Sequence, residues 1–375
     1  MSIHEYLDNI QNLQDGLLVY LENQADSELN YQILINTINK QKICSSKQEL
    51  TLLLHLISTI SQNYCRDFHF ISKIEKVLGY LGDYITSKFT NLEKFKIFKH
   101  NKRILLFLLE KTILTLDEFI VRKMISKDYL KAKYPQYFSP EIKPFMKLDW
   151  FPKSERNKWV KELEEFENQE NFFELRKEGE NEDYICKLIR SDSIDEFIQY
   201  VNRSNYSLKS TISDSIYETN LFLIESNKNN LTLIKYAAFF GSIQIFKYLL
   251  LNKVELTPQL WIYAIHGKNA DIIHFLEEYK IEPPKKNYKE SLIESIKCHY
   301  NDIVDYLLNQ YFQMENQNSN DLYIECIKHY NFSFFNDEFL NDTTFFYLCK
   351  YEYCSLMSFA LNDEKINVNK ILIFK

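Results

Sequence analysis

Apolar and polar residues follow a helical spacing through residues 231–308, and the same pattern occurs there three times. Each block contains two short apolar stripes separated by a turn. In the second stripe of the first block, Ile245, Tyr248 and Leu249 are three and four positions apart, which places them on one face of a helix. A single helical hairpin cannot bury such a stripe alone, so the pattern predicts stacked hairpins that cover one another.

Small residues mark corresponding places in the first helix of each block. Ala237 and Ala264 are 27 positions apart, and Ala264 and Ser295 are 31 apart. Small side chains are expected where stacked helices approach closely, and a period near 30 predicts a repeat array, which is a scaffold rather than a catalytic pocket. Gly241 follows the first helix, where we expect a positive φ. Residues 257–258 (Thr-Pro) predict a helix N-terminus.

The first block resembles the ankyrin repeat, whose common form is T-P-L-H-x-A-A-x-x-G-H-x-E-I-V-K-L-L-L. The positions that match are Thr232, Ala237, Ala238, Gly241, Ile245, Lys247, Leu249 and Leu250. The later blocks depart from this form. Residues 183–224 and 231–308 are more similar to a divergent ankyrin family of uncharacterised function, which is expanded in trichomonad parasites. The phrases G-S-I-Q-I-F-K-Y-L, V-E-L-T-P and K-C-H-Y-N-D carry this resemblance, which extends upstream to residues 101–108 and 134–142.

The chain divides by pattern into three parts. Residues 1–133 predict roughly six helices, and residues 134–153 contain four of the seven prolines, which indicates an ordered linker or bend. Residues 154–375 are expected to form the divergent ankyrin-repeat domain, with an incomplete C-terminal repeat. The predicted fold is therefore all-α, an N-terminal helical region followed by an ankyrin-type α-solenoid. Helical spacing is clearest at Leu52–Ile60, Phe70–Ile85, Ile104–Leu109 and Phe119–Leu130.

The third part has features of its own. A charged helix is expected over residues 154–177, with Ser154 as its cap, and an earlier repeat over residues 183–201. Residues 202–230 predict a long connection, a kind of loop that is usually functional. After a shortened repeat, residues 366–375 are expected to fold back as an end cap or to leave an apolar surface for self-association.

Composition excludes several classes of protein. The net charge of −7 and the lack of a basic face argue against nucleic-acid binding. No apolar run reaches the roughly 18 residues of a membrane helix. Seven cysteines without regular spacing indicate reduced thiols and a cytoplasmic location. Six glycines form neither a G-x-G-x-x-G nor a Walker pattern, so no nucleotide cofactor is expected.

Histidine and cysteine approach each other in the C-terminal half, where Cys298-His299 and Cys326-x-x-His329 could supply four zinc ligands. The H-Y-N phrase recurs 30 positions apart, and repetition explains it without a metal, so no metal site is predicted. No local signature of a catalytic triad is present. Trp261 is interpreted as core packing rather than as a ligand platform.

These observations favour a non-enzymatic scaffold that binds an unidentified partner protein on its concave helix and loop surface. Two alternatives remain open: an enzyme or enzyme subunit with its site in residues 1–133, and a degenerate structural member with no dedicated partner. A deep polar pocket with shifted pKa values in residues 1–133 would favour the first alternative. The candidate contact positions are Lys235, Tyr236, Glu255, Tyr263, Lys285, Lys286 and Tyr288.

Overall fold

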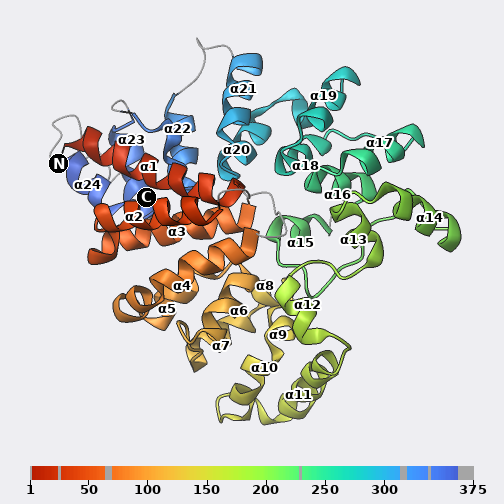
Figure 1. The fold of residues 1–375 in the computed structure, drawn as a ribbon. Coiled ribbons are helices and arrows are strands. Elements are labelled where there is room, and N and C mark those ends of the chain that lie inside the picture. Colours follow the sequence, from red (N-terminus) through yellow and green to blue (C-terminus); the bar gives the residue numbers. More distant parts are fainter. Residues whose placement is uncertain are drawn as a thin grey trace. The chain divides into compact units, whose positions relative to one another are not determined.

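The computed structural model describes residues 2–23, 27–63, 70–227, 230–312, 319–336 and 339–361. Over these residues the chain forms 24 α-helices and no strand, and the only extended pairing is a single antiparallel bridge between Thr211 and Thr232. The prediction of an all-helical chain is confirmed (Figure 1). The expected cap or self-association segment, residues 366–375, lies outside the described residues.

The chain divides into two compact units, and the boundaries between them fall in helix α4 (Phe70–Lys88) and before α18. Unit 1 comprises residues 1–77 and 258–375, and unit 2 comprises residues 78–257. Besides its part of α4, unit 1 contains α1 (Ile3–Glu22), α2 (Ser27–Lys40), η1 (Ile43–Ser45), α3 (Lys47–Asn63), α18 (Leu260–Gly267), α19 (Ala270–Glu278), η3 (Pro284–Lys286), α20 (Lys289–Lys297), α21 (Asn301–Tyr311), α22 (Ser319–Lys328), η5 (Phe332–Phe334), α23 (Asp342–Lys350) and α24 (Cys354–Leu361). Unit 2 contains α5 (Asn91–Phe98), α6 (Lys102–Glu110), α7 (Glu118–Met124), α8 (Lys127–Lys131), α9 (Tyr134–Tyr137), α10 (Ser139–Ile142), η2 (Lys143–Lys147), α11 (Lys153–Glu167), α12 (Phe172–Glu178), α13 (Tyr184–Arg190), α14 (Ile194–Ser204), α15 (Leu221–Asn227), α16 (Leu233–Phe240) and α17 (Ile243–Leu251).

The N-terminal third contains more helices than the sequence pattern predicts. Eight α-helices, α1–α8, begin within residues 1–133 rather than six. Residues 119–130 fall in two helices, α7 and α8, because Ser126 between them has an extended backbone (φ −71°, ψ 160°). A serine whose backbone leaves the helical region starts a new helix more readily than it continues an old one.

The proline-rich segment 134–153 is built of three short helical turns, α9, α10 and η2. Each turn has a proline in its first two positions, where the missing N–H costs no helical hydrogen bond. Four of its aromatic residues are buried, Tyr134, Tyr137, Phe138 and Phe151, so the segment packs against the protein.

The charged segment after it differs from the prediction in its boundaries. Two helices, α11 and α12, replace the single helix expected over residues 154–177. Ser154 lies inside α11 and Pro152 holds the cap position, so the predicted serine cap is wrong. The predicted N-terminus at residues 257–258 is also two residues early, because α18 begins at Leu260 after Gln259.

Six hairpins share one kind of turn: α13–α14, α16–α17, α18–α19, α20–α21, α22–η5 and α23–α24. In each of them a left-handed residue follows the first helix. These residues are Asp192, Gly241, Lys268, His299, Tyr330 and Glu352. In five of the six hairpins the next N–H bonds back to a carbonyl five residues earlier, which satisfies a helix-terminal carbonyl. These bonds run from Ser193 to Leu188, Ser242 to Ala237, Tyr300 to Ser295, Asn331 to Cys326 and Tyr353 to Leu348. The positive φ expected at Gly241 is confirmed at 67°.

One hydrogen bond between hairpins also recurs. The side chain just after the left-handed residue donates to the carbonyl that lies three residues before the left-handed residue of the preceding hairpin. The three cases are Ser242 Oγ to Ile189 O (2.5 Å), Asn331 Nδ2 to Ile296 O (3.0 Å) and Tyr353 Oη to Ile327 O (2.8 Å). This bond fixes how one hairpin stacks on the next within each unit.

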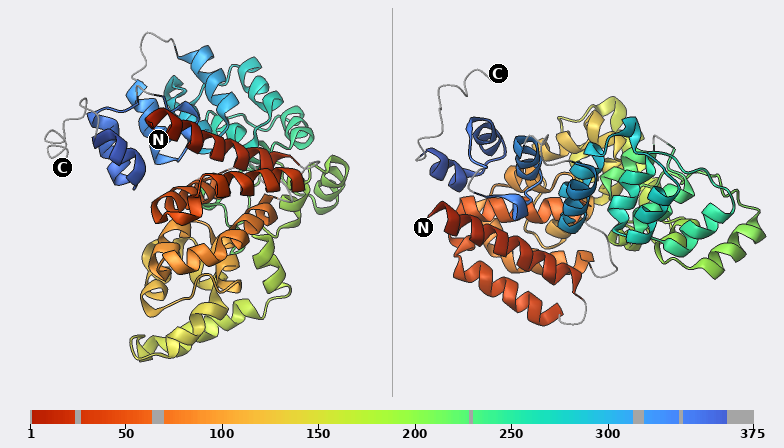
Figure 2. Two further views of the ribbon diagram at one scale, coloured as in Figure 1. Left: turned by 60° about the vertical axis from the view of Figure 1, so that its left-hand side comes forward. Right: turned by 90° about the horizontal axis from the view of Figure 1, so that it is seen from above.

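In unit 1 the N-terminal helix α1 packs against the last hairpins (Figure 2). The shortened second helix predicted near residue 332 is the single turn η5. Gln11 Nε2 donates to the carbonyls of Phe332 (3.0 Å) and Phe335 (2.8 Å), and Gln14 Oε1 accepts from the Phe332 N–H at 2.6 Å. Gln11 therefore satisfies two carbonyls that a full second helix would satisfy internally, and Gln14 satisfies an N-terminal N–H that no helix satisfies internally.

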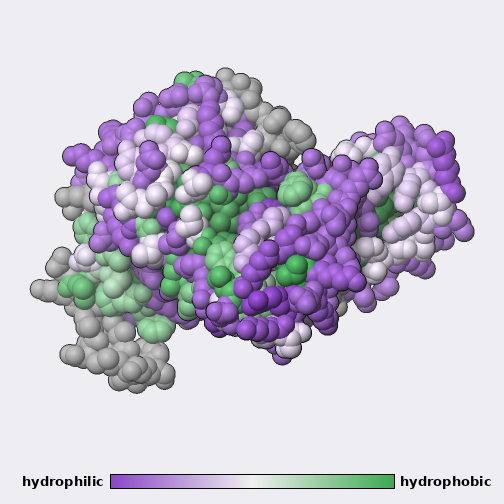
Figure 3. Space-filling model, turned by 90° about the horizontal axis from the view of Figure 1, so that it is seen from below, coloured by the Kyte–Doolittle hydropathy of each residue, from purple (hydrophilic) through white to green (hydrophobic). Residues whose placement is uncertain are grey.

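The surface is mixed in character. On the face drawn in Figure 3, hydrophilic residues cover much of the surface and hydrophobic residues lie among them. Within the described ranges, no helix combines the length and the apolar character that crossing a bilayer requires.

Candidate functional site

The seven predicted contact positions fall into three classes of exposure. Glu255, Lys285 and Lys286 are exposed, and Lys235 and Tyr288 are half-buried. Tyr236 and Tyr263 are only 1% and 5% exposed. The prediction that these two tyrosines contact a partner on an open surface is wrong, because their helices α16 and α18 present them to the interior.

The buried hydroxyl of Tyr236 has a specific hydrogen-bond partner in unit 2. Arg190 NH1 donates to Tyr236 Oη at 2.9 Å and to the carbonyl of Asn181 at 2.9 Å, while Arg190 Nε pairs with Glu180 at 2.7 Å. Burial is the main reason that the pKa of Tyr236 lies well above its usual range. The phenol is therefore a fixed, neutral group of the interior.

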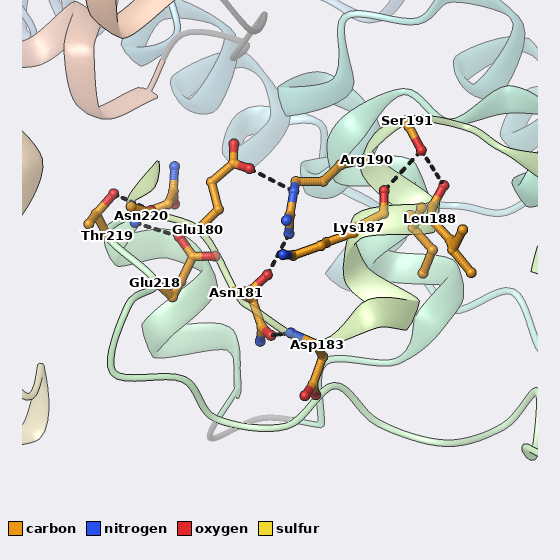
Figure 4. A network of polar contacts seen from close by, with 12 residues as sticks. Glu180, Asn181, Asp183, Lys187, Leu188, Arg190, Ser191, Glu218, Thr219 and Asn220 are labelled. Carbon is orange, nitrogen blue, oxygen red and sulfur yellow. Dashed lines mark hydrogen bonds and ion pairs between the residues drawn. The ribbon is translucent and has the colours of Figure 1, made fainter. Parts of the chain in front are cut away.

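The segment that pairs with this arginine, residues 179–181, also anchors the long connection that the sequence predicts as functional (Figure 4). Helices α14 and α15 shorten that connection to residues 205–220. Thr219 donates from its N–H (3.1 Å) and hydroxyl (2.7 Å) to the carbonyl of Gly179, and Asn181 Nδ2 donates to the carbonyl of Ser213 at 2.8 Å. Because these bonds hold both its end and its middle, the connection has a structural role in unit 2.

A short exposed turn in unit 1 holds the two predicted lysines. Lys285 and Lys286 in η3 both have left-handed backbones, with φ values of 58° and 56°. Lys286 pairs with Glu282 at 2.8 Å, with both side chains more than half exposed. Such an exposed pair contributes little stability, so its charges are available at the surface.

Beside this turn lies a group that we call the tyrosine–glutamate cluster: Glu277, Tyr288, Tyr306 and Tyr311. The rings of Tyr288 and Tyr311 stack with centroids 3.6 Å apart and planes 8° apart. Glu277 Oε1 accepts hydrogen bonds from the hydroxyls of Tyr306 and Tyr311, the latter at 2.6 Å. Trp261, fully buried as predicted, packs edge-on against Tyr288 at 5.1 Å.

The cluster has a defined electrostatic character. Partial burial alone would raise the pKa of Glu277, but the hydrogen bonds from Tyr306 and Tyr311 lower it below its usual value. Burial and the contact with Glu277 raise the pKa of Tyr306 to about 12. The carboxylate is therefore charged and the phenols neutral at pH 7. Sequence reasoning missed all but Tyr288, because the other members lie 11 to 23 positions from it and share no motif with it.

A separate cleft of about 430 Å³ lies in unit 2, between the α5–α6 junction, α8 and α15. Its lining includes Lys99, His100, Tyr129, Lys131 and Glu225. Burial and the positive charge of Lys99 lower the pKa of His100, while burial raises the pKa of Tyr129. The volume is in the range of small-molecule sites.

The structure also places one group of potential metal ligands together. Across the ranges that the structure describes, the ligand atoms of His266, Glu294 and Cys298 lie within 4.8 Å of one another. Of the four ligands considered from the sequence, only Cys298 belongs to this group. His299 instead bonds to the carbonyl of Tyr330 (3.2 Å).

The same three residues have the order of a nucleophile, a base and an orienting carboxylate. Cys298 is 0% and His266 1% exposed, however, so no substrate can reach the sulfur in this conformation. Their arrangement therefore does not support nucleophilic catalysis.

Searches against family models, curated proteins and solved structures find no match to this chain.

Proposed function

We propose that this protein is a non-enzymatic scaffold of the divergent ankyrin-repeat type, and that it binds a partner protein through the exposed turn η3 and the adjoining tyrosine–glutamate cluster. The observation that supports this most is the recurring hairpin, with its left-handed residue and its bond to the preceding hairpin. Stacked hairpins of this kind present loops on a rigid support, and a pre-organised surface loses little entropy on binding.

The chemistry of the η3 surface fits protein recognition. Tyrosine is enriched in protein interfaces, because its ring offers apolar area with few rotatable bonds and its hydroxyl offers a hydrogen bond. Tyr288 and Tyr311 are held in one geometry by stacking and by Glu277. Lys285 and Lys286 add exposed positive charge beside them, which favours a partner with an acidic segment.

Charge reversal tests the proposal. The full chain would be immobilised as the parent, as Lys285→Glu/Lys286→Glu, and as Lys158→Glu/Lys161→Glu, a control that reverses two exposed lysines of α11. Proteins captured from lysate would be quantified by mass spectrometry, and binding of the purified partner would then be measured. We expect the η3 variant to bind at least about tenfold more weakly, which corresponds to about 1.4 kcal/mol, and the control to bind like the parent.

Equal capture by all three proteins, or no protein enriched by the parent, would refute the proposed surface. Both variants should be checked for unchanged thermal melting. Because the lysines are exposed and make at most surface ion pairs, we expect stability changes within about 0.5 kcal/mol.

A second candidate function rests on the cleft in unit 2. Its volume, its two lysines and the shifted pKa values of His100 and Tyr129 fit a small-molecule site. The enzyme alternative places a site in residues 1–133, and this cleft lies partly there, since Tyr134 and residues of α15 also line it. Native mass spectrometry after incubation with a small-molecule extract would test it. A bound ligand that is retained by the parent and lost in Lys99→Glu/Lys131→Glu supports this function, and no ligand on the parent counts against it.

A further inference from the structure

His266, Glu294 and Cys298 lie where two consecutive hairpins of unit 1 meet. His266 is in the last turn of α18, Glu294 is in α20, and Cys298 is the residue directly after α20. The group is closed to solvent, since His266 and Cys298 are at most 1% exposed and the side chain of Glu294 is 12% exposed. A polar group buried to this degree requires an explanation.

The neighbouring hairpins show what the ordinary arrangement is. In α20 and in α22 a glutamate and a lysine three residues apart form an ion pair, Glu294–Lys297 at 3.1 Å and Glu325–Lys328 at 2.7 Å. Each of these lysines lies two positions before the left-handed residue of its hairpin. His266 has the same position in the preceding hairpin. The histidine and the cysteine are therefore additions to a recurring ion pair.

The three side chains form a chain of contacts through the two ring nitrogens. Cys298 Sγ lies 3.5 Å from His266 Nδ1, and His266 Nε2 lies 2.6 Å from Glu294 Oε1. Metal-bound histidines commonly donate their second ring N–H to a carboxylate, which fixes the ring and its tautomer. The sulfur and Nδ1 are thus placed as the ligand pair, and Glu294 as the acceptor that orients the imidazole.

The separation of the two ligand atoms, 3.5 Å, is close to the distance that a bridging ion requires. Bonds of about 2.1 Å to nitrogen and 2.3 Å to sulfur span roughly 3.5 Å when bent at a tetrahedral angle, and about 4.4 Å when linear. A metal ion can therefore enter with a change in the Sγ to Nδ1 separation of less than about 1 Å. Zinc would need further ligands, since it is almost always four-coordinate in proteins.

Charge balance selects the kind of ion. Lys297 already compensates Glu294, since the two side chains form an ion pair at 3.1 Å. The charge that remains to be balanced is the thiolate of Cys298. A monovalent ion gives a neutral buried site, whereas a divalent ion would leave an uncompensated charge, which is costly in a dry interior.

We infer that Cys298 Sγ and His266 Nδ1 form a buried site for a soft monovalent metal ion, Cu⁺, with Glu294 holding the imidazole in place. Thiolate and imidazole are ligands that Cu⁺ accepts, and Cu⁺ tolerates a low coordination number. Binding replaces the thiol proton by the ion, so one S–H bond breaks, one S–Cu bond forms and the proton leaves to solvent. No change of oxidation state is involved.

The test is a titration of the full chain with Cu⁺ under anaerobic, reducing conditions, in competition with the chelator bicinchoninate. The exposed Cys349 and Cys354 would be replaced by serine in every sample, so that they do not bind the ion. We expect the parent to bind one equivalent that Cys298→Ala does not bind. Cys326→Ala is the matched control, a fully buried cysteine in the next hairpin, and should bind like the parent.

Glu294→Gln should weaken Cu⁺ binding by about 10–100-fold without abolishing it, as expected for a residue that orients a ligand. Equal binding by Cys298→Ala and Cys326→Ala would overturn the inference, and so would a site that takes Zn²⁺ in preference to Cu⁺. If Cys298→Ala fails to fold, X-ray absorption at the copper edge of the parent decides the question. One sulfur and one imidazole nitrogen are expected, and a spectrum without imidazole scattering refutes the site.

Discussion

Asn331 is the residue whose removal tests the stacking of the hairpins most directly. It is fully buried, and its Nδ2 donates to the carbonyl of Ile296 in the preceding hairpin (3.0 Å) and to Asn301 Oδ1 (2.8 Å). Its Oδ1 accepts from the N–H of Ser333 and from Gln14 Nε2, both at 3.3 Å. Asn331→Ala therefore removes two bonds between hairpins, one within the local turn and one to helix α1.

The expected loss of stability depends on which partners of Asn331 keep another hydrogen bond. The Ile296 carbonyl also accepts from the His299 N–H at 3.1 Å, and Gln14 Nε2 also donates to Ser333 Oγ at 2.6 Å. Asn301 Oδ1 and the Ser333 N–H lose this partner, and both residues are half-buried. Because a buried group left unpaired costs about 1–3 kcal/mol and a half-buried one costs less, we expect a loss of about 1–3 kcal/mol in the free energy of unfolding.

The assay should report unit 1 alone, because two units need not unfold together. Trp261 is the tryptophan of unit 1, and Trp150 and Trp159 belong to unit 2. In a background with Trp150→Phe and Trp159→Phe, the fluorescence of Trp261 during urea unfolding follows unit 1. Asn309→Ala is the control, since Asn309 is exposed and lies in helix α21 of unit 1. If Asn331→Ala shifts the midpoint no more than this control does, the bond between hairpins does not stabilise the stack.

Two further predictions concern packing and pH. Ala237→Leu should cost about 1–3 kcal/mol by overpacking a fully buried position of α16, and an unchanged thermal midpoint would contradict this register. Burial lowers the pKa of His55 to about 4. Its stabilising effect is therefore present above pH 6.5 and is lost as the pH falls from 6.5 towards 4, by up to about 3 kcal/mol. His55→Leu should lose less stability over this interval in urea unfolding at pH 7 and pH 4.5, and an unchanged pH dependence would refute the assignment.

The local part of the fold could be predicted because it depends on spacing within the chain. The apolar stripe at Ile245 and Leu249 predicts the second helix α17, and both side chains are fully buried. The left-handed turn at Gly241 follows from the conformational freedom of glycine. The corresponding turn at Lys268 (φ 46°) could not be predicted in this way, because lysine gives no signal for a positive φ.

Burial of polar side chains could not be predicted, because it depends on partners that are distant in the sequence. Lys102 is 1% exposed and donates to the carbonyls of Ala132 (3.2 Å) and Ile216 (3.1 Å), which are 30 and 114 positions away. Tyr236 was predicted at the surface for the same reason, since no feature of its own helix indicates that Arg190 lies beside it. The tyrosine–glutamate cluster and the His266–Cys298 contact likewise join residues of different hairpins.

The recurring bond between hairpins does not depend on one type of residue. At the position after the left-handed residue, Ser242, Asn331 and Tyr353 differ in size, charge distribution and reach, yet each donates to the corresponding carbonyl of the preceding hairpin. Because the acceptor is a backbone carbonyl, it places no requirement on the side chain of the residue to which it belongs. Any donor that reaches the carbonyl preserves the stack, so the motif imposes a hydrogen-bonding requirement rather than a residue type. A sequence pattern defined by residue types therefore becomes harder to recognise along this chain, even where the same contact is present in successive hairpins.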